Sequence, residues 1–174
     1  MKDPKKTAEM NSASAAQYLP LKVVLRSVGE PVLADFGATR CAIDGPEPMF
    51  SFWKEVIEPK DDFEPDKETL IALMLNAKLR PLAYHQIALG SLSECIAHPR
   101  EIFRPVIVSA AYAFILAHNH PSGDPRPSQA DLSLTKNLRE GASVLQISFL
   151  DHVIVGRAGF SFPPYFSFRD AGLL

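Results

Sequence analysis

The stretch from Ala111 to Asp131, AYAFILAHNHPSGDPRPSQAD, decides how this chain folds. Its first part, residues 111–117, is apolar on both alternating faces, which is typical of a buried β-strand. This strand runs directly into His118-Asn119-His120. Because side chains alternate along an extended segment, His118 and His120 project to the same side, about two residues' rise apart. The sequence therefore places two imidazoles at the carboxyl end of a strand.

A helix is predicted after this strand, beyond a stiff turn. The turn PSGDPRP holds three prolines and one glycine, which lowers the entropy cost of ordering it. From Ser128 to Val144, apolar residues recur at every fourth position, a pattern that predicts one buried helix face. The residues of this stripe are Ala130, Leu134, Leu138 and Ala142. Asp131 lies in the first turn, where the helix N-terminus favours an anionic group.

The two histidines and the aspartate form a candidate metal site. His118, His120 and Asp131 offer two nitrogens and one oxygen, a ligand set that suits Zn²⁺. Three protein ligands leave one tetrahedral position open, which distinguishes catalytic zinc sites from structural ones. Water in such a position has its pKa lowered to about 7, so hydrolysis is the natural use of the site.

The flanking segments predict an α/β fold. Residues 68–76, ETLIALMLN, have the length and apolar content of a strand, and with residues 81–90 they predict a hairpin. Residues 99–109 predict a helix, with a kink or a late start because of Pro105. Residues 147–155 predict a last strand. In open sheets of this class, ligands bind at the carboxyl ends of strands, where the histidine pair falls.

Composition limits the protein to a few classes. The 174 residues are 47% hydrophobic and 22% charged, which favours one globular domain. The formal net charge of −2 indicates no general attraction to nucleic acid. Cys41 and Cys95 form no CxxC pair and are too few to crosslink the chain, which fits a reducing compartment. No apolar stretch approaches the roughly 18 residues that span a bilayer, so we expect a cytoplasmic protein without membrane attachment.

The N-terminal third is harder to interpret. Residues 1–17 lack apolar periodicity and predict a disordered tail. Residues 18–59 are expected to form an N-terminal extension of unknown role, with a strand at 21–28 and an amphipathic helical segment at 50–57. The main domain is then expected to cover residues 60–174.

A family resemblance adds to this interpretation. The spacing His118-x-His120-x7-Ser128-x2-Asp131 resembles the JAMM/MPN metalloprotease motif. The segments AHNHPSGDPRPSQAD and LDHVIVG are similar to its RadC-like (JAB domain) bacterial branch. The resemblance covers roughly residues 60–174. It implies a mixed β-sheet flanked by helices, a cytidine-deaminase-like core, and a zinc-dependent peptidase or isopeptidase.

The resemblance also implies catalytic roles. Glu68, which precedes an apolar strand, is similar in position to the JAMM glutamate that acts as general base and then general acid. Glu94 is a rival for this role. Ser128 matches the motif serine, which would donate its hydroxyl to the oxyanion of a tetrahedral intermediate.

Each of these residues also has a simpler interpretation. Ser128 and Asp131 have the spacing of a helix capping box. His118 and His120 have the alternative of being hydrogen-bonded polar side chains at a strand end. Asp124 lies in a Gly-Asp-Pro turn, where aspartate commonly binds its own backbone.

Three other histidines stand outside the predicted ligand set. Asp151 and His152 in the last strand either orient a ligand imidazole or are simply hydrogen-bonded in the core. His85 and His98 lack acidic or cysteine neighbours at ligand spacing. Trp53 is expected to pack rather than to stack on bases.

Three function classes follow from these observations. The first is a zinc metallopeptidase acting on an unidentified peptide or protein. The second is a DNA-associated accessory factor, since RadC-like proteins carry a DNA-repair label, and the third is a zinc-binding interaction module without turnover. A zinc deaminase is excluded because the chain has neither H-x-E nor PCxxC. The bond cleaved and the oligomeric state are not predicted by the sequence.

Overall fold

The computed structural model describes residues 41–90, 97–157 and 162–174. The predicted tail, the predicted strand at 21–28 and Glu94 lie outside these residues. In chain order, the elements are α2 (Pro46–Phe52), η1 (Trp53–Ile57), β1 (Thr69–Leu75), β2 (Pro81–Leu89), α3 (Pro99–Val108), β3 (Ala113–Asn119), α4 (Gln129–Leu145), β4 (Ser148–Val155) and β5 (Tyr165–Ser167). Of the helices described, none is both long and apolar enough to cross a bilayer.

The strands form one mixed sheet, as predicted. Their order across the sheet is β2-β1-β3-β4-β5. Strands β3 and β4 are parallel, and every other neighbouring pair is antiparallel. Parallel strands need a long crossover connection, which α4 provides. The protein is therefore an α/β fold in which α4 connects the two strands that carry His118 and His152.

The predicted hairpin of β1 and β2 is confirmed. Its turn is closed by Asn76, whose Oδ1 accepts hydrogen bonds from the amides of Lys78 (2.8 Å) and Arg80 (3.1 Å). Leu79 completes the turn in the left-handed region, at φ 56°. Asparagine favours such turns because its short side chain binds the backbone two residues ahead.

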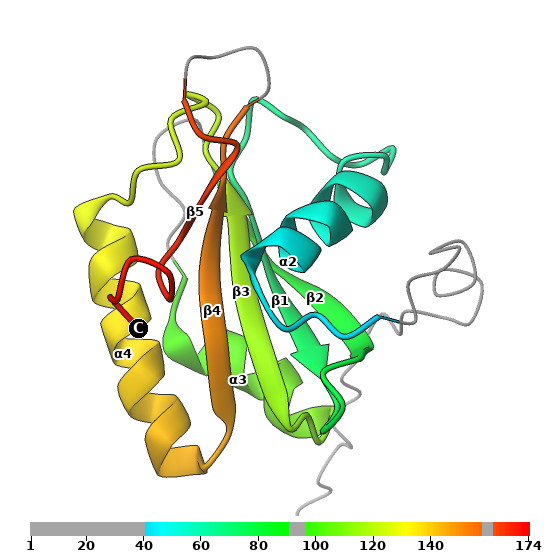
Figure 1. Cartoon of the computed structure of the whole chain (residues 1–174), viewed down its shortest axis with the longest axis vertical. Coiled ribbons are helices and arrows are strands. Elements are labelled where there is room, and N and C mark those ends of the chain that lie inside the picture. The colour runs from blue at the N-terminus through cyan, green and yellow to red at the C-terminus, as the bar shows by residue number, and fades with distance from the viewer. Residues whose placement is uncertain (1–40, 91–96, 158–161) are drawn as a thin grey trace, which may run out of the picture.

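The sheet separates two apolar clusters. On one face, Trp53 and Ile57 pack against Ile71, Leu73 and Ile115. On the other face, the cluster combines β1 and β3 with α3 and α4 through Leu70, Ala72, Phe103, Leu116 and Leu138. All residues of β1 and β3 are buried, because each strand is covered on both faces. Figure 1 shows α2 and α4 on opposite sides of the sheet.

The helical segment at 46–57 does not form a separate extension. Met49, Phe52 and Trp53 are each at most 1% exposed and belong to the same apolar cluster as β1 and β3. This part of residues 18–59, which were expected to form an extension of unknown role, therefore packs with residues beyond 60. An amphipathic segment shows which of its faces is apolar but not what covers that face, so the packing was not predictable from the sequence.

Two details of the helices also differ from expectation. Helix α3 begins at Pro99 and contains Pro105, so of the two predicted alternatives, a kink or a late start, the late start is excluded. In α4, the buried residues are Asp131, Thr135, Leu138 and Ala142. The apolar stripe predicted from the sequence had Ala130 and Leu134 in place of Asp131 and Thr135. Two polar residues replace them at the N-terminal end of the buried face, where the helix meets the histidines.

Candidate metal centre

His118 and His120 lie where β3 ends, at the middle of the sheet. His118 is 1% exposed and is paired with Leu70 of β1 and Ile154 of β4. The amide of His120 donates to the carbonyl of Val155 (3.0 Å), which continues the ladder beyond the strand. The two Nε2 atoms are 3.1 Å apart. The alternation predicted from the sequence thus brings both rings to one point.

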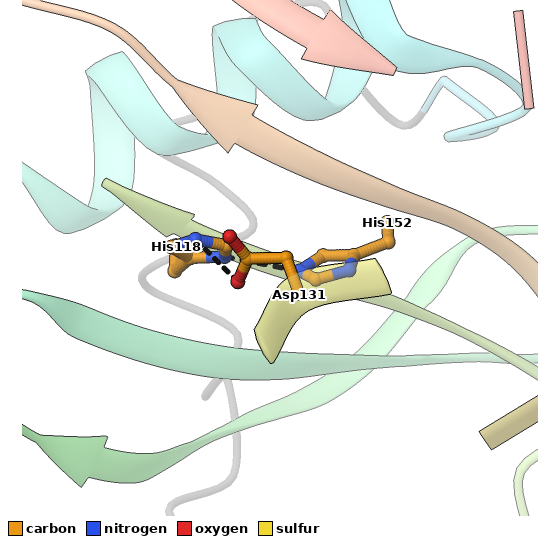
Figure 2. A group of neighbouring side chains, drawn as sticks. All are labelled: His118, Asp131 and His152. Atoms are coloured by element: carbon orange, nitrogen blue, oxygen red, sulfur yellow. Dashed lines mark hydrogen bonds and ion pairs between the residues drawn. The ribbon is translucent and has the colours of Figure 1, made fainter. Parts of the chain in front are cut away.

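Asp131 meets this pair from the first turn of α4. Its Oδ1 lies 3.3 Å from Nε2 of His118, and its Oδ2 lies 3.6 Å from Nε2 of His120. A full capping box holds the carboxylate, because Oδ2 accepts from the amide (2.8 Å) and hydroxyl (2.6 Å) of Ser128. The capping interpretation is confirmed, and it leaves Oδ1 directed at the imidazole (Figure 2).

The donor set fits a metal ion. Nδ1 of His120 donates to the carbonyl of Asp124 at 2.8 Å, because a carbonyl oxygen can only accept. In its neutral form, the ring therefore carries a lone pair on Nε2, which faces Nε2 of His118 and Asp131. Lone pairs on two ring nitrogens at 3.1 Å need a proton or a cation between them. Two nitrogens and a carboxylate oxygen that converge in this way suit Zn²⁺.

A second possible ligand set is His118, Asp131 and His152, whose donor atoms lie within 4.8 Å of one another. In this set, His152 would have to give up its contact with His118, where Nε2 and Nδ1 are 3.0 Å apart. His152 is also 0% exposed, so it lies beneath the site rather than at its mouth. We therefore assign the third position to His120, which is partly exposed.

Burial and local charge set the protonation of these rings. Burial lowers the pKa of His118 to about 4 and holds the pKa of His152 well below its ordinary value. Burial also acts to lower the pKa of His120, but the hydrogen bonds to Asp131 and Asp124 outweigh it and raise that pKa. His118 and His152 are therefore neutral at pH 7, and neutral imidazole is the form that binds metal.

Asp131 is held as a carboxylate. Burial acts to raise its pKa, but the interaction with His120 and the hydrogen bonds from Ser128 keep the pKa well below its usual range. An ionised carboxylate beside two imidazoles is the form a metal ligand requires.

Glu68 lies at the mouth of this group, directly before β1. Its Oε1 is 3.7 Å from Nε2 of His118, and its side chain is 17% exposed. Burial, with a contribution from the charge of Asp131, raises the pKa of Glu68, while His120 opposes this shift. A carboxylate with a raised pKa is better matched to proton transfer near neutral pH than an exposed one. The structure thus brings Glu68 to the three predicted ligands.

Comparison with known proteins agrees with this arrangement. The sequence model described as the RadC-like JAB domain matches residues 43–173. The chain belongs to this RadC-like JAB-domain family. The match includes all the residues of the site and the helical segment at 46–57.

The relatives of this RadC-like JAB domain are bacterial proteins named UPF0758. The chain is 42% identical to the one from Chlorobaculum parvum over 132 residues, which are 76% of this chain and 55% of the relative. It is 46% identical to the one from Geobacter sulfurreducens over 108 residues, or 62% and 45% of the two chains. It is 35% identical to the one from Desulforamulus reducens over 167 residues, or 96% and 69%. In the first two matches, the aligned region spans about half the length of the relative.

The remaining predicted residues of the RadC-like JAB domain are placed as follows. Asp124 forms the expected turn, with Oδ1 accepting from the amide of Arg126 (3.1 Å). His85 lies on β2, and His98 is the residue directly before α3, without a side-chain capping hydrogen bond, so neither joins the site. Trp53 is buried in the core, as predicted.

Asn119 has a role that was not predicted from the sequence. Its side chain points away from the histidines, where Oδ1 accepts from the amide of Thr69 (2.8 Å) and Nδ2 donates to the carbonyl of Lys67 (3.0 Å). These contacts hold the residues on both sides of Glu68. The signal was present in the HNH triplet, because a polar residue inside a buried strand must find hydrogen-bond partners.

Gly156, directly after β4, packs against the turn that carries Asp124. A Cβ atom here would lie 2.9 Å from the carbonyl oxygen of Gly123 and 3.0 Å from that of Pro163. Because these are backbone atoms, we expect Gly156→Ala to lower the free energy of unfolding by about 1–3 kcal/mol. The displaced turn should also draw the Asp124 carbonyl away from His120. Urea denaturation followed by circular dichroism measures the first effect, and a zinc titration measures the second.

Gly45→Ala is the matched control for this substitution. Its Cβ would meet the far end of the Arg169 side chain at 3.0 Å and Pro48 Cδ at 4.0 Å, and its φ of −163° suits any residue. We expect a smaller loss of stability in this variant. Equal urea midpoints for Gly156→Ala and the wild type would contradict the close approach.

Proposed function

We propose that this chain is a zinc-dependent metallohydrolase that cleaves peptide or isopeptide bonds in the cytoplasm. One observation carries the proposal: Nε2 of His118, Nε2 of His120 and the carboxylate of Asp131 converge within 3.6 Å of one another. The carboxylate of Glu68 stands 3.7 Å from the same group. A structural site needs no such carboxylate at its mouth, whereas hydrolysis does.

The residues have distinct tasks in this proposal. His118, His120 and Asp131 would hold Zn²⁺, which supplies Lewis acidity for carbonyl and water activation. Glu68 takes a proton from the attacking water and returns it to the leaving amine. The partly buried side chain of Glu68 suits both steps, because it lies close to the proposed metal ligands and remains accessible to a substrate.

Ser128 would stabilise the oxyanion formed on the substrate. Its hydroxyl donates to Oδ2 of Asp131 at 2.6 Å, so it must turn toward the substrate to act. The backbone amide of Ser128 also donates to Oδ2, at 2.8 Å. The carboxylate therefore keeps one partner when the hydroxyl turns away.

A cleft beside His120 is suited to a substrate side chain. It has a volume of about 240 Å³ and is bounded by Phe63, Pro65 and the paired Lys54 and Glu58. A larger cavity of about 510 Å³ follows β2 and contains none of the predicted site residues. We assign the substrate to the smaller cleft because it shares His120 with the proposed metal site. The substrate is an unidentified peptide or protein.

Elemental analysis of the purified chain tests the proposal together with a peptidase assay. We expect about one zinc per chain after reconstitution, as in other three-ligand sites. Cleavage of a peptide library, read by mass spectrometry, should require zinc and stop on addition of a chelator. A chain that takes up no zinc after reconstitution would refute the proposal.

The two other function classes give different results in the same experiments. Zinc uptake without cleavage would favour an interaction module. Salt-dependent binding to duplex or single-stranded DNA would favour the DNA-associated class.

A further inference from the structure

We propose that His152 and Thr135 are positioning residues that fix the ring of His118 with its Nε2 unprotonated and directed at the metal site. This inference rests on the proposed metal site. His152 lies on β4 and Thr135 lies on α4, and neither side chain is one of the three assigned ligands.

The hydrogen positions follow from the Thr135 hydroxyl. Its Oγ1 lies 2.7 Å from the carbonyl oxygen of Asp131 and 2.6 Å from Nδ1 of His152. The hydroxyl has one proton, and the carbonyl has none to donate. Both contacts are hydrogen bonds only if the hydroxyl donates to Asp131 and Nδ1–H of His152 donates to the hydroxyl.

The contact between His152 and His118 determines which nitrogen of His118 carries the proton. A neutral His152 that is protonated at Nδ1 presents a lone pair at Nε2. This atom lies 3.0 Å from Nδ1 of His118, which must therefore be the donor. The proton of His118 then resides on Nδ1, and Nε2 faces His120 and Asp131 as a lone pair. A single chain of hydrogen bonds thus sets the tautomer that a metal ligand needs.

The chain also connects the elements that carry the ligands. It begins at the backbone of Asp131 on α4, passes through Thr135 and His152, and ends at His118 on β3. Figure 2 shows the side chains of His118, Asp131 and His152 gathered in one group, and Nδ1 of His118 contacts Nε2 of His152 directly. His152 therefore fixes the orientation of one ligand relative to the helix that carries another.

The ring of His152 also packs against a residue outside the chain of hydrogen bonds. Phe168 stacks on it, with ring centroids 4.7 Å apart and planes 13° from parallel. Asp151 anchors this segment, because its carboxylate accepts from the Ser167 hydroxyl (2.6 Å) and from the amides of His152 (2.8 Å) and Arg169 (3.0 Å). A side chain held on every side is suited to positioning, since a loose ring would not fix its neighbour.

Thr135→Val and His152→Leu test the inference in the full chain. Thr135→Val removes the hydroxyl and nearly keeps the shape of the side chain, and His152→Leu removes both ring nitrogens and keeps an apolar side chain beside Phe168. We expect zinc affinity, measured by competition with a chromophoric chelator, to fall about 10–100-fold in both variants. Thr135→Ser keeps the hydroxyl and should retain the wild-type affinity. His152→Gln keeps an acceptor and a donor and should recover part of the loss.

A matched control separates positioning from stability. Val106 is fully buried in the same apolar cluster as residues of α4, and it has no polar side-chain atom with which to join the chain of hydrogen bonds. Val106→Ala should lower the melting temperature and leave zinc affinity unchanged. If Thr135→Val and His152→Leu bind zinc as tightly as Val106→Ala, the residues are merely structural and the inference fails.

Imidazole ¹⁵N NMR of the metal-free wild type gives a second, independent readout. The inference requires Nδ1–H tautomers for both His118 and His152. An Nε2–H tautomer of His118 would overturn it, whether or not the chain takes up zinc. Absence of zinc from the wild type, with both tautomers as expected, would instead count against the proposed function alone.

Discussion

Glu68→Gln is expected to lower the rate of zinc-dependent peptide hydrolysis by about 10²–10⁴-fold, the range for loss of a general base. Glutamine keeps the size and one acceptor oxygen of glutamate but cannot take a proton. The carboxylate stands 3.7 Å from Nε2 of His118 and is not one of the three assigned ligands. Zinc per chain should therefore be unchanged. Single-turnover cleavage of a fluorogenic peptide measures the rate, and elemental analysis measures the zinc.

Glu64→Gln is the matched control for this variant. Glu64 lies in the same loop, and its side chain is 53% exposed and paired with Lys67. Exposed pairs of this kind contribute little to stability, so Glu64→Gln should keep full activity and full zinc. If Glu68→Gln remained fully active, the base would have to be another residue, and Glu94 would be tested next.

Asp131→Ala is expected to abolish stable zinc binding and also to destabilise the metal-free protein. The substitution removes the oxygen ligand and the carboxylate half of the capping box of α4, while Oγ of Ser128 still accepts from the backbone amide of residue 131. Loss of the hydrogen bonds to the carboxylate should cost about 1 kcal/mol in free energy of unfolding, which lowers the melting temperature by roughly 2–4 °C in a chain of this size. Elemental analysis and thermal denaturation of the metal-free protein measure the two effects.

Two comparisons separate these effects of Asp131→Ala. Ser128→Ala removes the hydroxyl of the cap but keeps the ligand oxygen, so it should lose stability and retain zinc. His120→Ala keeps the cap and removes a ligand, so it should lose zinc with little change in the melting temperature of the metal-free chain. If Asp131→Ala kept one zinc per chain, His152 or Glu68 would have to complete the ligand set.

Local patterns in the sequence predicted the elements that position the site. The alternation of His118 and His120 follows from the period of a strand, and Asp131 follows from the start signal of a helix. Both signals act over a few residues, so tertiary packing did not override them. The hairpin of β1 and β2 was predictable for the same reason, since one short polar break separates two apolar runs.

Contacts across the sheet were not predictable from the sequence. His152 and His118 are 34 positions apart, and they meet only because β3 and β4 pair in parallel in the observed register. A shift of one residue would have turned His152 to the other face. For Thr135, hydrophobic periodicity was misleading, because a threonine at a buried position does not count toward an apolar stripe.

Strands β1 and β3 lie inside the sheet, and their buried residues leave no route for water. In native-state hydrogen exchange, amide protons of such strands are released only by openings that approach global unfolding. Partial openings are instead expected at β2 and β5, each of which has one neighbouring strand among the described residues. In partially unfolded forms of this kind, the backbone of β3 that carries His118 remains protected from exchange. The imidazole of His118 is therefore expected to keep its place after the outer strands have opened.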